Sequence, residues 1–304
     1  MTRIPFCLLA ALLVGCSSQQ QTFKSPDAAA DSLASALRAG DTSRLDKIFG
    51  KEGAAIVSSG DPVADKGDFA KFVEAYDAKH ELSPAADGEM TLTIGKDDWP
   101  FPVPITQSDK GWMFDTAAGK DEILNRRIGR NELSTIEVCC AVVDAQREYA
   151  RLDPGGVGLP VYARRIISEP GKKNGLYWPT AAGEPPSPLG PLVAEAADEG
   201  YTAKGKAKGE SAPYHGYRYR LLTAQGPNAP GGAMDYVVGG HLLSGFGLIA
   251  YPAEYGNSGV MTFMINHQGE LFQKDLGDKT HDVARSINTF DPGEGWTKCE
   301  KPQE

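Results

Sequence analysis

The sequence has few cysteines and no pattern of metal-binding residues. Five cysteines occur in 304 residues, and no two have the C-x-x-C spacing of a zinc site or a thioredoxin-type motif. The five histidines are scattered, with no H-x-x-x-H or H-E-x-x-H spacing. We therefore expect neither a metal site nor a cofactor.

The sequence also has fewer basic than acidic residues. Lysine and arginine together number 31 against 40 aspartates and glutamates, which gives a formal charge of −9 at pH 7. An acidic balance disfavours nucleic acid as a general partner, and we expect none. It does not exclude a local basic patch, such as the one formed by Arg126, Arg127 and Arg130.

The sequence has no apolar run long enough to span a bilayer as a helix. The most apolar run, Ile4–Val14, has the length of the central part of a signal peptide. Arg3 supplies positive charge before the run, and Leu13-Val14-Gly15-Cys16 closes it. A lipoprotein signal peptidase recognises this order, so we predict cleavage before Cys16 and lipidation of its thiol. An ordinary cleaved signal peptide is the alternative.

Lipidation would attach the mature protein to a membrane. Two or more acyl chains anchor stably, because each buried methylene contributes ~0.8 kcal/mol. Ser17 follows Cys16 in place of an aspartate, which in enteric-type bacteria favours export to the outer membrane. We expect residues 1–15 to be the signal peptide and residues 16–22 a polar tether. The mature protein would then lie in the bacterial cell envelope, facing the periplasm.

Three cysteines remain in what should be an oxidising compartment. They are Cys139, Cys140 and Cys299, since Cys7 leaves with the signal peptide. Cys139 and Cys140 are adjacent in a predicted helix, so their side chains point about 100° apart and should not bridge each other. We predict that Cys299 bonds either Cys139 or Cys140. The alternative is three reduced thiols.

Residues 23–118 are expected to fold as a small α+β domain, with helices first and a sheet second. The predicted helices are Ser25–Gly40, Asp41–Phe49 and Asp68–Lys79, and the predicted strands are Met90–Ile94, Phe101–Ile105 and Gly111–Phe114. This order resembles the cone-shaped folds of the nuclear transport factor 2 type. The resemblance implies a pocket between helix and sheet, and the side chains expected to line it are Phe72, Tyr76, Trp99 and Trp112.

Residues 119–304 are expected to pack an antiparallel sheet on a long helix. The helix, predicted over Gly119–Arg151, is apolar on two opposite sides and should therefore be covered on both. We expect it to lie between the N-terminal domain and the C-terminal sheet, with Gly129 at the joint. The predicted strands are Gly216–Leu222, Phe246–Ala250, Val260–Ile265 and Leu271–Lys274, followed by a helix over Asp282–Phe290.

Several segments of the mature chain resemble one bacterial family, known as "domain of unknown function 2950". They are RRIGRNEL (126–133), DAQREYA (144–150), GLYWP (175–179), SPLGP (187–191), PYHGY (213–217), GGA (231–233) and the run from AYPA (250–253) to KDLG (274–277). Together they cover nearly the whole mature chain. The resemblance implies an exported bacterial protein and implies no activity.

The C-terminal half is also similar to type IV pilin-like domains. The shared features are a helix ending in Ala-Gln-x-x-Tyr-Ala, a glycine-rich loop and a Gly-Tyr-x-Tyr strand, here residues 145–150, 155–158 and 216–219. Those domains wrap a sheet on a long helix. This resemblance implies a fold and not filament assembly, because the chain begins with a lipoprotein signal and its helix is internal.

Aromatic residues give the sharpest candidate for a binding surface. They cluster in segments that flank the predicted sheet: Tyr177, Trp178, Tyr214, Tyr217, Tyr219, Tyr251 and Tyr255. With the neighbouring prolines and glycines they could form a carbohydrate or peptide groove. The alternative, which we favour, is that they pack inside and order the large loops.

No catalytic constellation occurs in the sequence. We therefore expect a lipid-anchored envelope protein with a structural or binding role, whose partner is another envelope protein or a glycan. One alternative is a cell-wall or polysaccharide hydrolase at the domain junction, with Glu132 and Glu148 as its acids. The other is a small-ligand pocket in the N-terminal domain.

Overall fold

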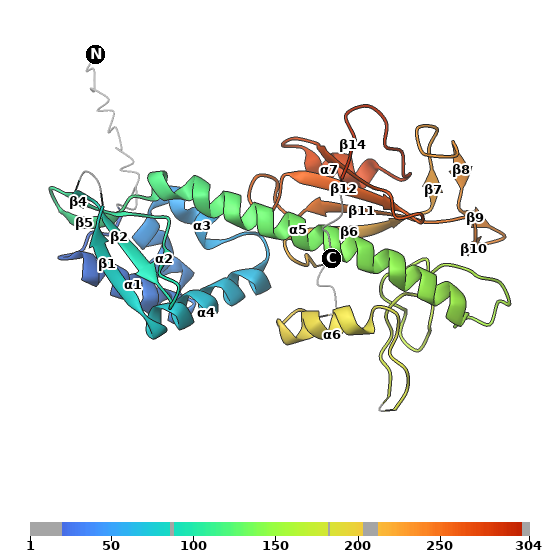
Figure 1. Cartoon of the computed structure of the whole chain (residues 1–304), viewed down its shortest axis with the longest axis horizontal. Helices are drawn as coiled ribbons and strands as arrows, with labels where there is room; N and C mark the ends of the chain where they lie inside the picture. The colour runs from blue at the N-terminus through green and yellow to red at the C-terminus, as the bar shows by residue number, and fades with distance from the viewer. Residues whose placement is uncertain (1–19, 86–87, 182, 203–211, 300–304) are drawn as a thin grey trace, which may run out of the picture.

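The fold consists of two regions joined by one long helix. The structure, a computed structural model, describes residues 20–85, 88–181, 183–202 and 212–299. Figure 1 shows helix α5 (Thr116–Leu152) passing from an N-terminal region, residues 20–115, into a C-terminal region, residues 153–299. The predicted signal peptide and Cys16 lie outside the described residues.

Helices come first in the N-terminal region. They are α1 (Pro26–Ala39), α2 (Thr42–Phe49), the 3₁₀ turn η1 (Lys51–Gly53), α3 (Ala54–Val57) and α4 (Pro62–Ala78). Ser25 caps α1 by accepting a hydrogen bond from the Ala28 amide at 3.2 Å, and Gly40 ends it with a φ of 61°. Both boundaries were predicted. Helix α4 begins at Pro62 and not at Asp68, because Asp61 caps it.

One antiparallel sheet completes the N-terminal region. Its strands are β1 (His80–Pro84), β2 (Met90–Ile94), β3 (Trp99–Pro100), β4 (Ile105–Ser108) and β5 (Gly111–Phe114). They are ordered β1-β2-β4-β5, with β3 beside β2. The predictions of β2 and β5 are confirmed. The prediction of a strand over Phe101–Ile105 is wrong, because Pro102 and Pro104 have no N–H to donate and the strand begins only at Ile105.

Helix α5 runs for 37 residues, which confirms the predicted long helix. Asp115 caps it by accepting a hydrogen bond from the Ala118 amide at 3.1 Å. Gly129 does not interrupt it, but it lies where the partners of the helix change. Before it, Arg127 bonds backbone of the N-terminal region; after it, Asn131 donates to the Ser258 carbonyl at 2.9 Å.

The second half of α5 is covered on both sides, as predicted, but not by the elements we expected. The C-terminal sheet packs on one side, against residues such as Ile136 and Val143. The other side faces the loop that contains Trp178 and helix α6 (Gly190–Asp198), not the N-terminal region. Figure 1 shows α6 and the sheet on opposite sides of α5. The expected sandwich is therefore wrong, because the N-terminal region packs only along the first turns of the helix.

The C-terminal sheet is the antiparallel meander that was predicted, extended by one edge strand. Its strands are β6 (Tyr217–Leu222), β11 (Gly247–Pro252), β12 (Met261–Asn266), β13 (Leu271–Asp275) and β14 (Thr297–Lys298), in the order β14-β13-β12-β11-β6. Asn266 shapes the turn between β12 and β13, since its side-chain oxygen accepts from the amides of Gln268 and Glu270 at 3.0 and 2.9 Å.

Short elements surround this sheet. They are the ribbon of β7 (Ala224–Gln225) with β8 (Met234–Asp235), the ribbon of β9 (Val237–Val238) with β10 (His241–Leu242), and helix α7 (Thr280–Ser286). Helix α7 ends before the predicted Phe290, whose amide bonds the Ala224 carbonyl at 2.9 Å instead. Within the described residues, no helix combines the length and apolar character needed to cross a membrane.

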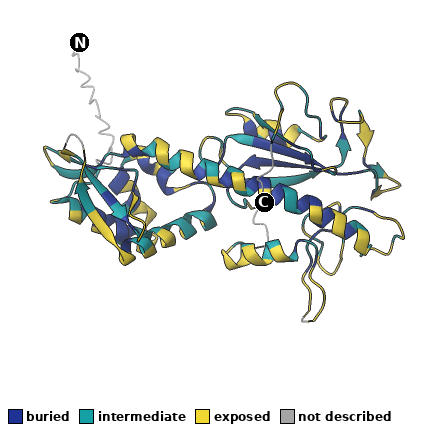
Figure 2. Cartoon of the chain, in the orientation of Figure 1, coloured by how far each residue is buried: buried dark blue, intermediate teal, exposed yellow. Residues whose placement is uncertain are grey.

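Both faces of the C-terminal sheet are buried. Successive side chains of β11 alternate between two core clusters, as strand geometry requires. Leu248 and Ala250 pack with α5, whereas Ile249 and Tyr251 pack on the opposite face with α7. Figure 2 shows the central strands buried throughout. A third, separate cluster fills the N-terminal region between α1, α2 and the sheet.

Candidate functional site

Helix α4 packs its apolar side against the core cluster of the N-terminal region and also lines a cavity with it. Of its 17 residues only Tyr76 is buried. Phe69, Phe72 and Ala75 share one side of the helix and are only half-buried. All three line a cavity of about 510 Å³. Apolar side chains that face open space are the informative exception in a folded domain, because most such groups are packed.

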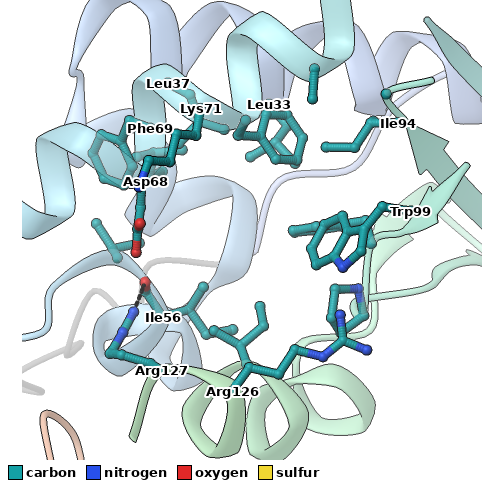
Figure 3. Close-up of a pocket in the computed structure, with 18 of the residues that line it drawn as sticks. Leu33, Leu37, Ile56, Asp68, Phe69, Lys71, Ile94, Trp99, Arg126 and Arg127 are labelled. Carbon is teal, nitrogen blue, oxygen red and sulfur yellow. Dashed lines mark hydrogen bonds between the residues drawn. The ribbon is translucent and has the colours of Figure 1, made fainter. Parts of the chain in front are cut away.

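The cavity, here called the α4 pocket, lies between α4, the N-terminal sheet and the first turns of α5. Figure 3 shows side chains from these elements surrounding an open centre. The inner wall is aliphatic and aromatic, and it is formed by Leu33, Leu37, Leu45, Phe49, Ile56, Val57, Ile94, Phe101 and Ile123. The α4 pocket thus opens directly onto the core cluster of the N-terminal region.

Aromatic rings form one wall of the α4 pocket. Phe101 packs edge-on against Phe72 and against Phe114, with ring centroids 5.4 and 6.2 Å apart. The Trp99 ring lies 6.3 Å from Phe101 on the other side. Trp99 is 39% exposed, which places a large apolar ring at the opening of the pocket.

Charged side chains from α5 and α4 line the opening. The Arg126 guanidinium lies 5.2 Å from the centroid of Trp99, within cation–π range, and its Nε donates to Glu122 at 2.6 Å. Arg130, one turn further along, pairs with Asp68 on α4 at 2.6 Å. Figure 3 shows Arg126 and Trp99 together on one side of the opening, with Asp68 across from them.

Arg127, between these two, is buried. Its guanidinium donates to the carbonyls of Ala55 and Ile56 at 2.6 and 2.7 Å and to the side-chain oxygen of Asn257 at 2.6 Å. Burial lowers the pKa of Arg127, whereas the nearby carboxylate of Asp65 acts in the opposite direction. Arg127 therefore ties the floor of the pocket to the C-terminal region.

The family model described as a protein of unknown function (DUF2950) matches residues 20–299. The chain belongs to this family. No curated protein and no solved structure matches it. The resemblance found in the sequence is therefore confirmed for the DUF2950 family, whereas the similarity to pilin-like domains stays a prediction.

The sequence predicted part of the α4 pocket of this DUF2950 chain. Phe72 and Trp99 line it, as expected. Tyr76 does not; its hydroxyl donates to Asp31 at 2.8 Å. Trp112 packs against the same cluster without lining the pocket. The arginines were visible in the sequence as a basic patch, but only the packing of α5 against α4 brings them to an apolar opening.

The predicted aromatic surface of this DUF2950 chain is not one surface. Trp178, Tyr217 and Tyr251 are buried, so they cannot contact a partner. Tyr177, Tyr214 and Tyr219 pack against the same cluster as Trp178. Tyr255 lies apart on the loop after β11, where its hydroxyl donates to Asp275 at 3.2 Å.

The two predicted hydrolase acids are far apart. Glu132 accepts hydrogen bonds from the amides of Val260 and Met261, both at 3.0 Å, and so holds the start of β12. Glu148 is exposed, 16 residues further along the same helix, which corresponds to about 24 Å at ~1.5 Å per residue. Glycosidase pairs stand ~5–9.5 Å apart. The two carboxyl groups therefore cannot act as a pair.

The three predicted cysteines lie in one core cluster. Cys139 is fully buried, which raises the pKa of its thiol, and Cys140 and Cys299 pack beside it. Among the described residues the structure contains no disulfide. The bond from Cys299 to Cys139 or Cys140 stays a prediction. The described part of the chain holds no group of three His, Cys, Asp or Glu placed to bind a metal ion.

A second cavity lies between α5 and α6. Its volume is about 360 Å³, and the described residues that line it carry no charge. Tyr201, Tyr214 and Tyr219 form part of its wall. The α4 pocket is larger, and the described residues around it combine an apolar interior with a charged opening, so it is the better candidate site.

Proposed function

We propose that this protein binds a small apolar molecule in the α4 pocket. The observation that carries the proposal is the apolar side of α4, which is only half-buried and lines the pocket. The volume of the α4 pocket, about 510 Å³, lies within the ~300–1,000 Å³ typical of ligand pockets. An apolar ligand would gain about 25 cal/mol for each Å² that it removes from water.

Binding of a neutral fluorescent probe, N-phenyl-1-naphthylamine, tests the proposal. The variant Ala75→Phe places a ring inside the α4 pocket, because Ala75 lines it. We expect this variant to weaken probe binding at least about tenfold. Ala70→Phe is the matched control, since Ala70 is exposed on the same helix and does not line the pocket.

Circular dichroism of both variants checks that each remains folded. Absence of probe binding to the wild type would contradict the proposal. Equal binding by the wild type and by folded Ala75→Phe would place the probe elsewhere and would also contradict it.

We also propose that lipid on Cys16 holds this pocket at the surface of the outer membrane. The order of Arg3, the apolar run and Leu13-Val14-Gly15-Cys16 supports lipidation. The fold begins close to that cysteine, because the Gln20 side chain donates to the carbonyls of Ile48 and Phe114 at 2.9 and 2.7 Å. Four residues span at most ~14 Å, so the N-terminal region would stay near the lipid surface.

Metabolic labelling with palmitate tests the anchor. We expect label in the wild type and in Cys7→Ala, because Cys7 leaves with the signal peptide. Cys16→Ala should lose the label and accumulate as the uncleaved precursor. Globomycin should make the uncleaved precursor accumulate in the wild type. Absence of label from the wild type would refute the anchor.

A further inference from the structure

The charges at the opening of the α4 pocket point to the chemistry of its ligand. Arg126 uses its Nε for Glu122, and its two terminal nitrogens make no hydrogen bond to any described residue. The Arg126 guanidinium that carries them lies beside Trp99, next to the apolar wall of the pocket, as Figure 3 shows. A guanidinium edge with two free donors matches the two oxygens of a carboxylate.

A second cation at the pocket, Lys71, has no carboxylate partner among the described residues. Lys71 is exposed on α4, lines the pocket and forms no ion pair with a described residue. Arg127 and Arg130 differ from it, because the first is bonded to backbone carbonyls and the second to Asp68. Lys71 and Arg126 are therefore the two cations available to a bound anion.

The net charge of the lining is small and positive. The charged residues that line the pocket are Lys71, Arg126, Arg127, Arg130, Asp68 and Asp97. Four basic and two acidic side chains leave an excess of two in the lining, and the carboxylates of Glu122 beside Arg126 and of Asp65 near Arg127 partly offset it from outside the pocket. Such an excess complements a head group with a single negative charge better than a doubly charged one.

We infer that the ligand is a single-chain amphiphile with a carboxylate head group, a conclusion that rests on the proposed function. Its apolar chain would lie along Phe72 and Phe101 in the interior. Its carboxylate would meet Arg126 and Lys71 at the opening. The volume of about 510 Å³ lies in the lower half of the range for ligand pockets, which suits one chain and not the two of a phospholipid.

Displacement of N-phenyl-1-naphthylamine by dodecanoate and by 1-dodecanol tests this inference, because the two competitors differ only in the head group. We expect dodecanoate to bind the wild type about tenfold more tightly than dodecanol, as hydrogen bonds to a charged group contribute ~1.5 kcal/mol or more. Decanoate, two methylenes shorter, should bind about fifteenfold more weakly than dodecanoate.

Two variants locate the head group. Arg126→Gln and Lys71→Gln should each weaken dodecanoate binding, the first by about tenfold, and should leave dodecanol binding unchanged. Both side chains are exposed, so the variants should fold. Arg151→Gln is the matched control, because Arg151 is exposed on the same helix and does not line the pocket.

The outcomes separate this inference from the proposed function. Dodecanoate and dodecanol that displace the probe equally would overturn the carboxylate and leave the apolar pocket standing. A preference for dodecanoate that survives in both Arg126→Gln and Lys71→Gln would overturn the assigned head-group site. Failure of the probe itself to bind would remove the proposed function and this inference together.

Discussion

Three arginines within five residues of α5 make different interactions because their surroundings differ. Arg126 and Arg130 are exposed and each pairs with one carboxylate, whereas Arg127 is buried and donates to three oxygens. Exposed pairs contribute little to stability, since water and salt screen them. A buried carbonyl that loses its donor stays unsatisfied, which costs far more.

Replacing Arg127 should therefore be much more damaging than replacing Arg130. We expect Arg127→Leu to lower the free energy of unfolding by about 3 kcal/mol, because the carbonyls of Ala55 and Ile56 lose their donor. Arg130→Gln should cost less than about 1 kcal/mol. Urea unfolding of both variants measures this, and equal losses would show that Arg127 is not the link described above.

His267 should make stability depend on pH. Burial lowers the pKa of His267 below its usual 6.5, and Arg147 nearby acts in the same direction, whereas Glu270 opposes it. Below pH 6.5 the unfolded chain therefore binds more protons than the folded one, so stability falls as the pH drops through that value. The stability that the neutral His267 side chain contributes is fully present at pH values above 6.5.

We expect the free energy of unfolding to fall between about pH 7.5 and about pH 5.5 in the wild type, and to fall less in His267→Gln. His241→Gln is the control, because His241 is exposed on β10. Urea unfolding at several pH values measures the difference. The same slope in the wild type and in His267→Gln would contradict the assignment.

Two glycines of α5 should respond in opposite ways to the same substitution. A Cβ on Gly119 would lie 2.5 Å from the Val103 Cα and 2.6 Å from the Pro102 carbonyl oxygen, and backbone there cannot move aside cheaply. A Cβ on Gly129 would have no neighbour within 4 Å. Gly119 thus lets the helix approach the segment before β4, whereas Gly129 only lowers helix propensity.

We therefore expect Gly129→Ala to stabilise the protein by up to about 1 kcal/mol and Gly119→Ala to destabilise it by about 1–3 kcal/mol. Urea unfolding measures both on one helix. Stabilisation by both substitutions would mean that the close contact at Val103 relaxes without cost.

The elements that were predicted well are those whose signals are local. Ser25 and Gly40 bracket α1, because capping chemistry acts within a few residues. The strand over Phe101–Ile105 failed because periodicity was weighed above the missing amides of Pro102 and Pro104. Even so, Phe101 is buried, as the apolar pattern requires.

The candidate site depended on information that the sequence does not contain. The aromatic residues of α4 have the same sequence pattern whether they face a core or a cavity. Phe72 could therefore be predicted as a lining residue, whereas the volume of the cavity beside it could not be predicted. Arg126 and Trp99 are 27 positions apart, and only the packing of α5 brings them together. The buried tyrosines of the C-terminal region were ambiguous for the same reason.

At the scale of the whole molecule, polar contacts join the two regions. Asp61, the N-cap of α4, also accepts hydrogen bonds from the Tyr201 hydroxyl at 2.8 Å and the Gly216 amide at 3.0 Å. Asn257 donates to the Ser58 carbonyl at 2.8 Å and accepts from Arg127. These bonds connect both ends of the loop between α3 and α4 to the C-terminal region.

The last prediction follows from these contacts and from the continuity of α5. The two regions should unfold as one unit, so amides of β2 and β12 should report the same free energy of opening in hydrogen exchange. In the double variant Asp61→Ala, Asn257→Ala, we expect β2 to open at least about 1 kcal/mol more easily than β12, because the polar bonds between the regions are lost. Ser25→Ala is the matched control, since it removes a helix cap within the N-terminal region and no bond between regions. It should lower both values together. Unequal opening in the wild type would show that α5 alone does not make the molecule cooperative and that these contacts do not couple the regions.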